Sequence, residues 1–137
     1  VDSVSAVDSS EDSVAEDAKV SDAKTDEEKA ARTQAIQDAT LVAAQTPLHT
    51  MEVCLQVFDL CEAMINIGNQ SSVTDAGVGA LCARTGVLGA GMNVRVNASS
   101  LKDEAVKAQL LERASELERM ANEKEAKLSA IVYEKIK

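Results

Sequence analysis

The sequence predicts an all-α fold: a bundle of long helices, kinked at Pro47, that ends in a long C-terminal amphipathic helix. Ala, Val and Leu supply most of the hydrophobic fraction of 45%, and the only aromatic side chains are Phe58 and Tyr133. A β-rich domain would need alternating runs of β-branched and aromatic residues, which this sequence does not contain. Its apolar residues recur three and four positions apart instead, as they do on one face of a helix.

The first 24 residues differ in composition from the rest of the chain. They are rich in Ser and Asp, and the first 25 residues hold seven acids against Lys19 and Lys24, which is more than half of the net charge of −9. Two interpretations are open: a solvated, disordered segment, or a frayed helix docked on the remainder. We favour the partial helix, and divide the chain into an acidic, partly ordered leader, 1–24, and one helical domain, 25–137.

The first half of this domain is expected to form two helical stretches on either side of Pro47. The sequence Thr-Asp-Glu-Glu at 25–28 fits a capping box, and a helix follows to about residue 45. Proline must end or kink that helix, because it lacks an N–H and its ring clashes with the preceding turn. A second stretch then covers about 48–67. The Gly-Asn at 68–69 stops it, since both residues tolerate a left-handed backbone.

The second half of the domain is expected to contain two more helices. The sequence Ser-Val-Thr-Asp at 72–75 offers another capping box for a helix over about 74–96. Small residues spaced three and four apart line this helix and predict close packing against another helix or a second subunit: Ala76, Gly79, Ala80, Ala83, Gly86 and Ala90. The last helix, about 100–136, carries a clean apolar stripe and alternating Glu and Lys or Arg elsewhere.

Composition excludes several classes of function. Nucleic-acid binding needs a basic face and stacking aromatics, whereas this chain carries a net charge of −9 and two aromatic residues. No run approaches the roughly 18 apolar residues of a membrane span. Its three cysteines show no CxxC spacing and His49 is the only histidine, so neither a metal site nor a disulfide framework is expected. We expect a cytoplasmic protein.

A few polar residues in the glycine-containing region are candidates for chemistry. Asp75 is either a capping carboxylate or a general acid/base. Asn93 and Asn97 share one helical face, where an interior helix gains little from asparagine, so they are either hydrogen-bonding groups for a heteroaromatic ring or structural caps. Arg95 faces elsewhere and suits a ligand carboxylate or an acid on a neighbouring chain. Asn69 is more typical of a turn than of a ligand contact.

Taken in order, these segments resemble the cyclodeaminase/cyclohydrolase family. That family includes the cyclodeaminase domain of formiminotransferase-cyclodeaminase and bacterial stand-alone relatives. The similar stretches are TDEEKAARTQAI at 25–36, AAQTPL at 43–48, GNQSSVTDAGVGA at 68–80 and GVLGAGMNVRVNASSLKD at 86–103. The resemblance covers about residues 25 to 137, and it is the combination of these stretches that is specific.

The resemblance implies an all-α enzyme that acts on a tetrahydrofolate derivative without a metal, as a homodimer or higher oligomer, with a formiminotransferase as a further partner. The implied reaction is ring closure of 5-formiminotetrahydrofolate to 5,10-methenyltetrahydrofolate with loss of ammonia, or hydrolysis of the methenyl form. The positions that match are Asp75, as catalytic residue, and Asn69, Asn93, Arg95 and Asn97, as substrate-binding residues. We expect Asp75 and the two later asparagines to line one hollow.

The chain departs from the family pattern in one respect. Family members contain a Pro-Gly-Gly-Gly-Ser stretch before a helix of small residues, and this sequence has none. The departure indicates a fragment or a shortened relative. It leaves a rival hypothesis open, in which the chain is a non-catalytic helical oligomerisation module derived from this family.

Overall fold

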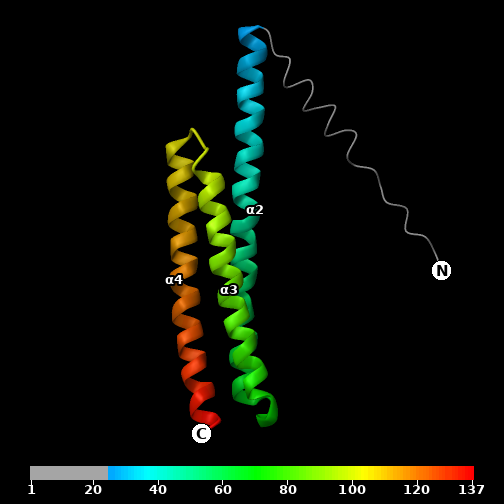
Figure 1. The fold of residues 1–137 in the computed structure, drawn as a ribbon, viewed down its shortest axis with the longest axis vertical. Helices are drawn as coiled ribbons and strands as arrows, with labels where there is room; N and C mark the ends of the chain where they lie inside the picture. The colour runs from blue at the N-terminus through cyan, green and yellow to red at the C-terminus, as the bar shows by residue number, and fades with distance from the viewer. Residues whose placement is uncertain (1–24) are drawn as a thin grey trace, which may run out of the picture. The chain divides into compact units, whose positions relative to one another are not determined.

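The computed structural model describes residues 25–137, so the predicted leader lies outside the described residues. In order along the chain, the elements are α2 (Asp26–Ile67), the short 3₁₀ helix η1 (Gln70–Ser72), α3 (Val73–Ala98) and α4 (Glu104–Lys135). No strand occurs in this part of the chain, and the all-α prediction is confirmed. Within residues 39–137, α3 runs back along α2, and α4 runs back along α3 (Figure 1).

The first thirteen residues of α2, up to Asp38, are held by local interactions. The Thr25 N–H donates to Glu28 Oε2 at 3.0 Å, and the Glu28 N–H donates to Thr25 Oγ1 at 3.1 Å. This reciprocal pair confirms the predicted capping box. One turn from Asp38, the Gln34 side-chain amide donates to its carboxylate at 2.8 Å.

Pro47 lies inside α2 rather than at its end. Of the two outcomes expected at this residue, an end and a kink, the structure excludes the end, because one helix of 42 residues passes through it. Proline removes one N–H from the helical ladder, and the carbonyl four residues earlier loses its partner. A side chain of α3 replaces that partner, as described below.

The turn between α2 and α3 differs from the predicted one. The first helix ends at Ile67 as expected, but no residue in the described range 25–137 has a positive φ, so a left-handed cap is not the reason. Asn69 is extended instead (φ −64°, ψ 128°), and its side-chain oxygen accepts from the Ser71 N–H at 3.1 Å. Ser72 precedes α3 without a side-chain cap hydrogen bond, so the capping box predicted at 72–75 is wrong.

The helix α4 begins later than predicted because Asp103 caps it. The Asp103 carboxylate accepts from the N–H groups of Ala105 and Val106 at 3.0 and 3.1 Å. The predicted apolar stripe of this helix is confirmed, since its buried side chains are Leu110, Ala114, Leu117, Ala121, Leu128 and Val132. The helix therefore presents one face to the core along its whole length.

Sulfur atoms of α2 pack against glycines of α3. A Cβ built on Gly86 would lie 2.8 Å from Cys54 Sγ, and one built on Gly79 would lie 3.1 Å from Cys61 Sγ. The step of seven from Cys54 to Cys61 along α2 matches a step of seven backward, from Gly86 to Gly79, along α3, which is the register of two antiparallel helices. The predicted close packing of the small residues is confirmed. The two helices can approach this closely because Gly79 and Gly86 have no side chain.

The α3–α4 pair shows the same spacing. A Cβ on Gly77 would lie 3.2 Å from Val132 Cγ2. Seven residues on, Arg84 Nε lies 3.9 Å from Glu125 Oε2. Seven further, Gly91 leaves room for the Glu118 carboxylate. Helix α3 is thus fixed against both of its neighbours by contacts one heptad apart.

Candidate functional site at the α2–α3 junction

Asn97 supplies the hydrogen bond that Pro47 cannot make. In an α-helix the N–H of residue 47 would donate to the carbonyl of Ala43, four residues earlier. Asn97 Nδ2 of α3 donates to that carbonyl oxygen at 2.9 Å instead. The two features singled out in the sequence, the proline and the second asparagine, are therefore one structural unit.

A hollow of about 440 Å³ lies beside this hydrogen bond. Helix α2 contributes Ala43, Thr46, Pro47 and Thr50 to its lining, and α3 contributes Asn93 and Asn97. Asn93 is exposed and Asn97 is half-buried. Two of the predicted substrate-binding residues thus share one hollow, as their spacing of four on one helix indicated.

The other polar side chains of the hollow donate hydrogen bonds to backbone carbonyls of their own helices. Thr46 Oγ1 donates to the Val42 carbonyl at 2.9 Å, and Thr50 Oγ1 donates to the Thr46 carbonyl at 3.2 Å. Asn93 Nδ2 donates, more weakly, to the Gly89 carbonyl at 3.4 Å. The side-chain oxygens and the second N–H of Asn93 are consequently the groups that remain for a ligand.

Arg95 faces away from the hollow and pairs with α4. Its guanidinium reaches both carboxylate oxygens of Glu118, at 2.5 and 2.8 Å, and also donates to Ser115 Oγ and to the Gly91 carbonyl, each at 3.2 Å. A Cβ on Gly91 would collide with Glu118 Oε1, so a larger residue here would displace this carboxylate. The acid that the sequence left open for Arg95 is supplied by the chain itself.

Asp75 and Asn69 lie at the other end of α3. Asp75 is exposed in the first turn of the helix, where the dipole favours a negative charge. Eighteen positions separate it from Asn93 along the same helix, which corresponds to a rise of about 27 Å. The expectation that Asp75, Asn93 and Asn97 line one hollow is therefore wrong for a single chain, because a straight helix holds its two ends apart.

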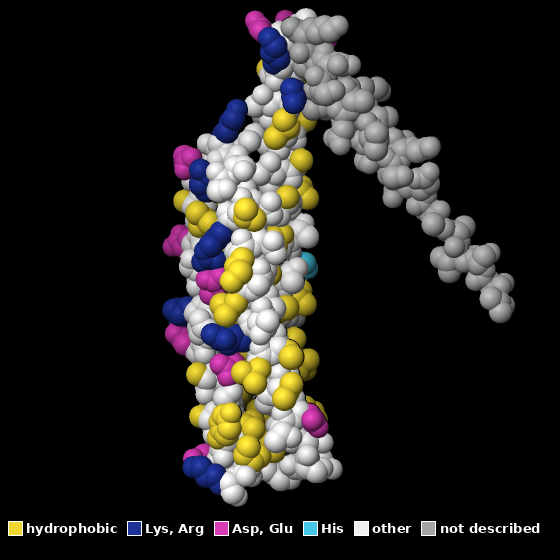
Figure 2. Space-filling view, in the orientation of Figure 1, with side chains coloured by type: hydrophobic (Ala, Val, Ile, Leu, Met, Phe, Trp, Pro, Cys, Tyr) yellow, Lys and Arg dark blue, Asp and Glu magenta, His cyan; other side chains and the backbone are white. Residues whose placement is uncertain are grey.

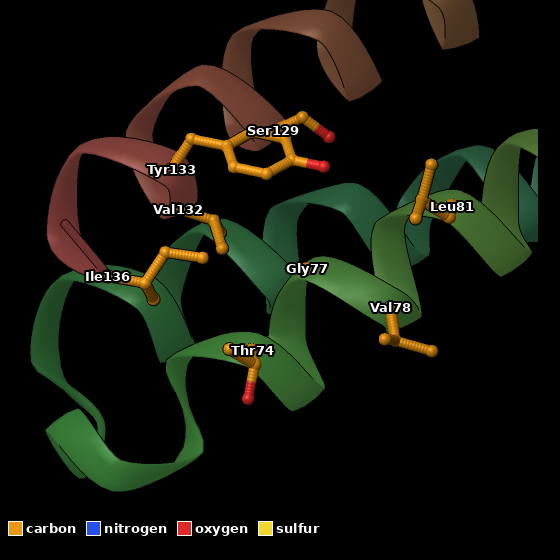
Figure 3. A pocket seen from close by; sticks show the side chains of 8 residues that line it. All are labelled: Thr74, Gly77, Val78, Leu81, Ser129, Val132, Tyr133 and Ile136. Atoms are coloured by element: carbon orange, nitrogen blue, oxygen red, sulfur yellow. The ribbon is translucent and has the colours of Figure 1, made fainter.

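A second, smaller pocket was not predicted from the sequence. Its volume is about 160 Å³, and it is lined by Thr74, Gly77, Val78 and Leu81 of α3 with Ser129, Val132, Tyr133 and Ile136 near the end of α4. In Figure 3 the Tyr133 ring and the Ser129 hydroxyl lie on its α4 side, opposite Val78 and Leu81. The sequence signal that could have indicated this pocket is the pair of apolar residues Val78 and Leu81, which are exposed and fall outside the small-residue pattern.

Two side chains in the part of the chain that the structure describes, Cys61 and Arg113, have a shifted pKa. Burial raises the pKa of the Cys61 thiol. Hydrogen bonds to Glu116 and Glu52 raise the pKa of the Arg113 guanidinium. Neither residue lines the hollow. Within residues 25–137, no three His, Cys, Asp or Glu side chains gather closely enough to hold a metal ion, and no helix combines the length and apolarity needed to cross a bilayer.

Comparison with known proteins identifies the family. The family model described as formiminotransferase-cyclodeaminase matches residues 11–116, most of the chain. This chain belongs to the formiminotransferase-cyclodeaminase family. The predicted site residues at 69, 75, 93, 95 and 97 all fall within the matched range, and the resemblance inferred from the sequence is confirmed.

Individual members of the formiminotransferase-cyclodeaminase family show how far the similarity extends. A methenyltetrahydrofolate cyclohydrolase of Methylorubrum extorquens is 42% identical over 110 residues, which cover 80% of this chain and 51% of the relative. A formimidoyltransferase-cyclodeaminase of Rattus norvegicus is 32% identical over 90 residues, or 66% of this chain and 17% of the relative, and that of Sus scrofa matches equally. The chain spans about half the length of the first of these relatives.

Proposed function

We propose that this chain is the catalytic part of a tetrahydrofolate cyclohydrolase or cyclodeaminase. The observation that carries the proposal is the 42% identity to a methenyltetrahydrofolate cyclohydrolase over 80% of the chain. The hollow beside Pro47 supports it, since a flat heterocycle with amide-like groups suits the two carboxamides that line it. The substrate is a tetrahydrofolate derivative, and the proposal needs no metal.

Both candidate reactions are proton transfers around one carbon atom. In hydrolysis, water adds to the methenyl carbon and gives one proton to a base. The hydroxyl so formed then loses its second proton as the formyl C=O forms, while the bond from that carbon to ring nitrogen N5 breaks and N5 is protonated. In cyclodeamination, N10 attacks the formimino carbon and loses its proton. The formimino nitrogen gains two protons in all, and the bond from it to that carbon breaks as ammonia leaves. Asp75 is the residue we propose for this proton transfer, because its exposed carboxylate lies in the first turn of α3.

The decisive experiment measures turnover of the full-length protein that contains this chain. Release of ammonia from 5-formiminotetrahydrofolate and hydrolysis of 5,10-methenyltetrahydrofolate are followed separately. We expect Asp75→Asn to lower kcat about 100-fold or more while the urea midpoint changes little. Asp59→Asn, at an exposed acid of α2, serves as the matched control. Turnover unchanged in Asp75→Asn refutes the role of this residue, and absence of both activities in the wild type refutes the function.

A second copy of the chain is the partner that we propose first. The acids of α2 within the bundle pair with cations of α4: Glu52 with Arg113, Asp59 with Lys124 and Glu62 with Lys127. Both arginines of α3 also turn to α4. Figure 2 accordingly shows charged side chains gathered over α4, and hydrophobic ones over α2 and α3.

The outer face of α2 and α3 is consequently apolar and almost uncharged. Its exposed large side chains include Val42, Val53, Leu60, Met64, Val78, Leu81, Met92 and Val96. A chain of net charge −9 repels its own copies, so this face is where two copies can approach without that cost. Met92→Glu should separate the copies in sedimentation velocity, whereas Ala130→Glu on the outer side of α4 should not.

Assembly would also join the two ends of the candidate site. In a homodimer whose α3 helices run antiparallel, the Asp75 end of one chain meets the Asn93 end of the other. Mixing inactive Asp75→Asn and Asn93→Ala chains would then restore about a quarter of the wild-type turnover, because half of the dimers are mixed and each mixed dimer contains one intact site. No recovery after confirmed subunit exchange contradicts a shared site.

The separation of Asp75 from Asn93 within one chain also favours a second candidate, a helical oligomerisation module without catalysis. Binding of tetrahydrofolate distinguishes the two functions, because the module does not require it. We propose a formiminotransferase as a further partner, because the rat relative is named a formimidoyltransferase-cyclodeaminase. We propose the cytoplasm as the compartment, because a formiminotransferase there would supply the substrate of this chain.

A further inference from the structure

We infer that the hollow beside Pro47 binds the hydrogen-bond-donor edge of its ligand, a ring N–H next to an amino group, through the side-chain oxygens of Asn93 and Asn97. The inference rests on the folate substrate proposed above, and it makes specific the expectation that these amides are hydrogen-bonding groups for a heteroaromatic ring. It assigns the 2-amino-4-oxo edge of a reduced pterin to this hollow.

The orientation of both carboxamides follows from their partners. Asn97 Nδ2 lies 2.9 Å from the Ala43 carbonyl oxygen, and Asn93 Nδ2 lies 3.4 Å from the Gly89 carbonyl oxygen. A carbonyl only accepts, so the nitrogen of each amide must face it and the oxygen must face away. For Asn97 this orientation is imposed by Pro47, because no backbone N–H is present to replace the amide.

The lining of the hollow therefore offers more acceptors than donors. Both threonine hydroxyls and one proton of each amide already bond to carbonyls. Within residues 25–137, no hydrogen bond reaches the side-chain oxygen of Asn93 or Asn97. Each of these oxygens has two lone pairs for a ligand, whereas each amide nitrogen has a single proton left.

The chemistry of the lining selects between two related rings. Pterin carries an amino group beside its ring N3–H, so it presents adjacent donors. Lumazine carries an oxo group in place of that amino group, and would place an acceptor against an acceptor. Loss of one such hydrogen bond weakens binding about tenfold. Pterin should accordingly bind about tenfold more tightly than lumazine.

The test titrates the full chain, labelled with ¹⁵N, with pterin and with lumazine while NMR follows the side-chain amide signals. We expect the shifts to cluster at Asn93 and Asn97, with a pterin preference of about tenfold. Asn93→Asp keeps an oxygen of the same shape and retains the preference, and Asn93→Leu removes it. Asn66→Leu, at an exposed position of α2 far along the helix from Pro47, is the matched control and leaves both titrations unchanged.

Two results would overturn the inference. The inference fails if the two rings bind with equal affinity, or if the NMR shifts are confined to residues outside the hollow. Either result would show that the oxygens of Asn93 and Asn97 do not bind the donor edge of the ring. The proposed folate function would be unaffected, because the turnover assay tests it separately. Binding of neither ring would also overturn the inference, and the turnover of the full-length protein would then decide the proposed function independently.

Discussion

Two glycines of α3 offer a direct test of the packing between α2 and α3. Gly86 and Gly89 lie three residues apart within the same helix, and alanine in place of either should give the same intrinsic helix gain of about 1 kcal/mol. Their surroundings differ. A Cβ on Gly89 would meet nothing within 4 Å, whereas a Cβ on Gly86 would lie 2.8 Å from Cys54 Sγ.

These surroundings give the two substitutions opposite expected outcomes. Gly89→Ala should stabilise the chain by the full intrinsic gain of about 1 kcal/mol, and raise Tm by about 4 °C. Gly86→Ala should receive the same gain but lose about 1–3 kcal/mol to overpacking against the sulfur. Its net effect then ranges from neutral to a loss of about 2 kcal/mol.

Urea unfolding followed by far-UV circular dichroism, at one fixed protein concentration, measures both variants. A Cys54→Ala background provides the control, because it removes the sulfur that a Cβ at Gly86 would meet. There Gly86→Ala should become stabilising, and the difference between backgrounds is the coupling energy. Equal stabilisation by both glycine substitutions in the wild-type background would refute the reasoning that Gly86 exists for the sulfur contact.

Three further outcomes are expected. Asn97→Ala should lower the free energy of unfolding by about 1 kcal/mol in the wild type. The loss should be much smaller in a Pro47→Ala background, because the backbone N–H at position 47 can then donate to the Ala43 carbonyl. Equal losses in the two backgrounds of this double-mutant cycle would contradict the compensation of Pro47 by Asn97. Arg95→Lys should cost about 1 kcal/mol by urea unfolding, because lysine cannot reach both oxygens of Glu118, and a loss that persists unchanged in a Glu118→Gln background would exclude this pair as its cause. Burial raises the pKa of the Cys61 thiol, so the contribution of this thiol to the free energy of unfolding is complete below the ordinary thiol pKa and is lost as pH rises through the raised value. The urea midpoint of Cys61→Ala should therefore fall less steeply at alkaline pH than that of the wild type. An identical fall would show that Cys61 does not cause the alkaline loss of stability.

Much of the fold could be predicted from the sequence because its signals are local. The capping box at Thr25 and Glu28 depends on two side chains three residues apart, and both hydrogen bonds are present. The stripe of α4 repeats over many turns and specifies one buried face. The small residues spaced along α3 indicated close packing, and Gly79 and Gly86 indeed lie against sulfur atoms of α2.

The continuity of α2 could not be predicted, because its cause is distant in sequence. Pro47 weakens the helix locally, and the compensating amide of Asn97 arrives from fifty residues further along. A stripe or a motif around Pro47 contains no sign of that partner. The same distance explains why Asn97 remained open between a structural and a binding role.

The candidate site was predicted in part. The spacing of Asn93 and Asn97 placed them correctly on one face, and the hollow beside them follows from their contact with α2. Arg95 was assigned to a ligand, because its acid, Glu118, lies on another helix. Asp75 was placed with the asparagines because their motifs are neighbours in the family pattern, although the length of one rigid helix separates them.

The heptad spacing of contacts on both sides of α3 has a consequence for assembly. A shift of α3 by one heptad along α2 could place Cys54 Sγ against Gly79. It would then place Cys61 Sγ against the turn that precedes α3, where no glycine makes room for it. The same shift would push Glu118 away from the backbone gap at Gly91. Only one axial position of α3 satisfies its contacts with both α2 and α4. The pair of helices that packs first therefore determines the axial position of the third.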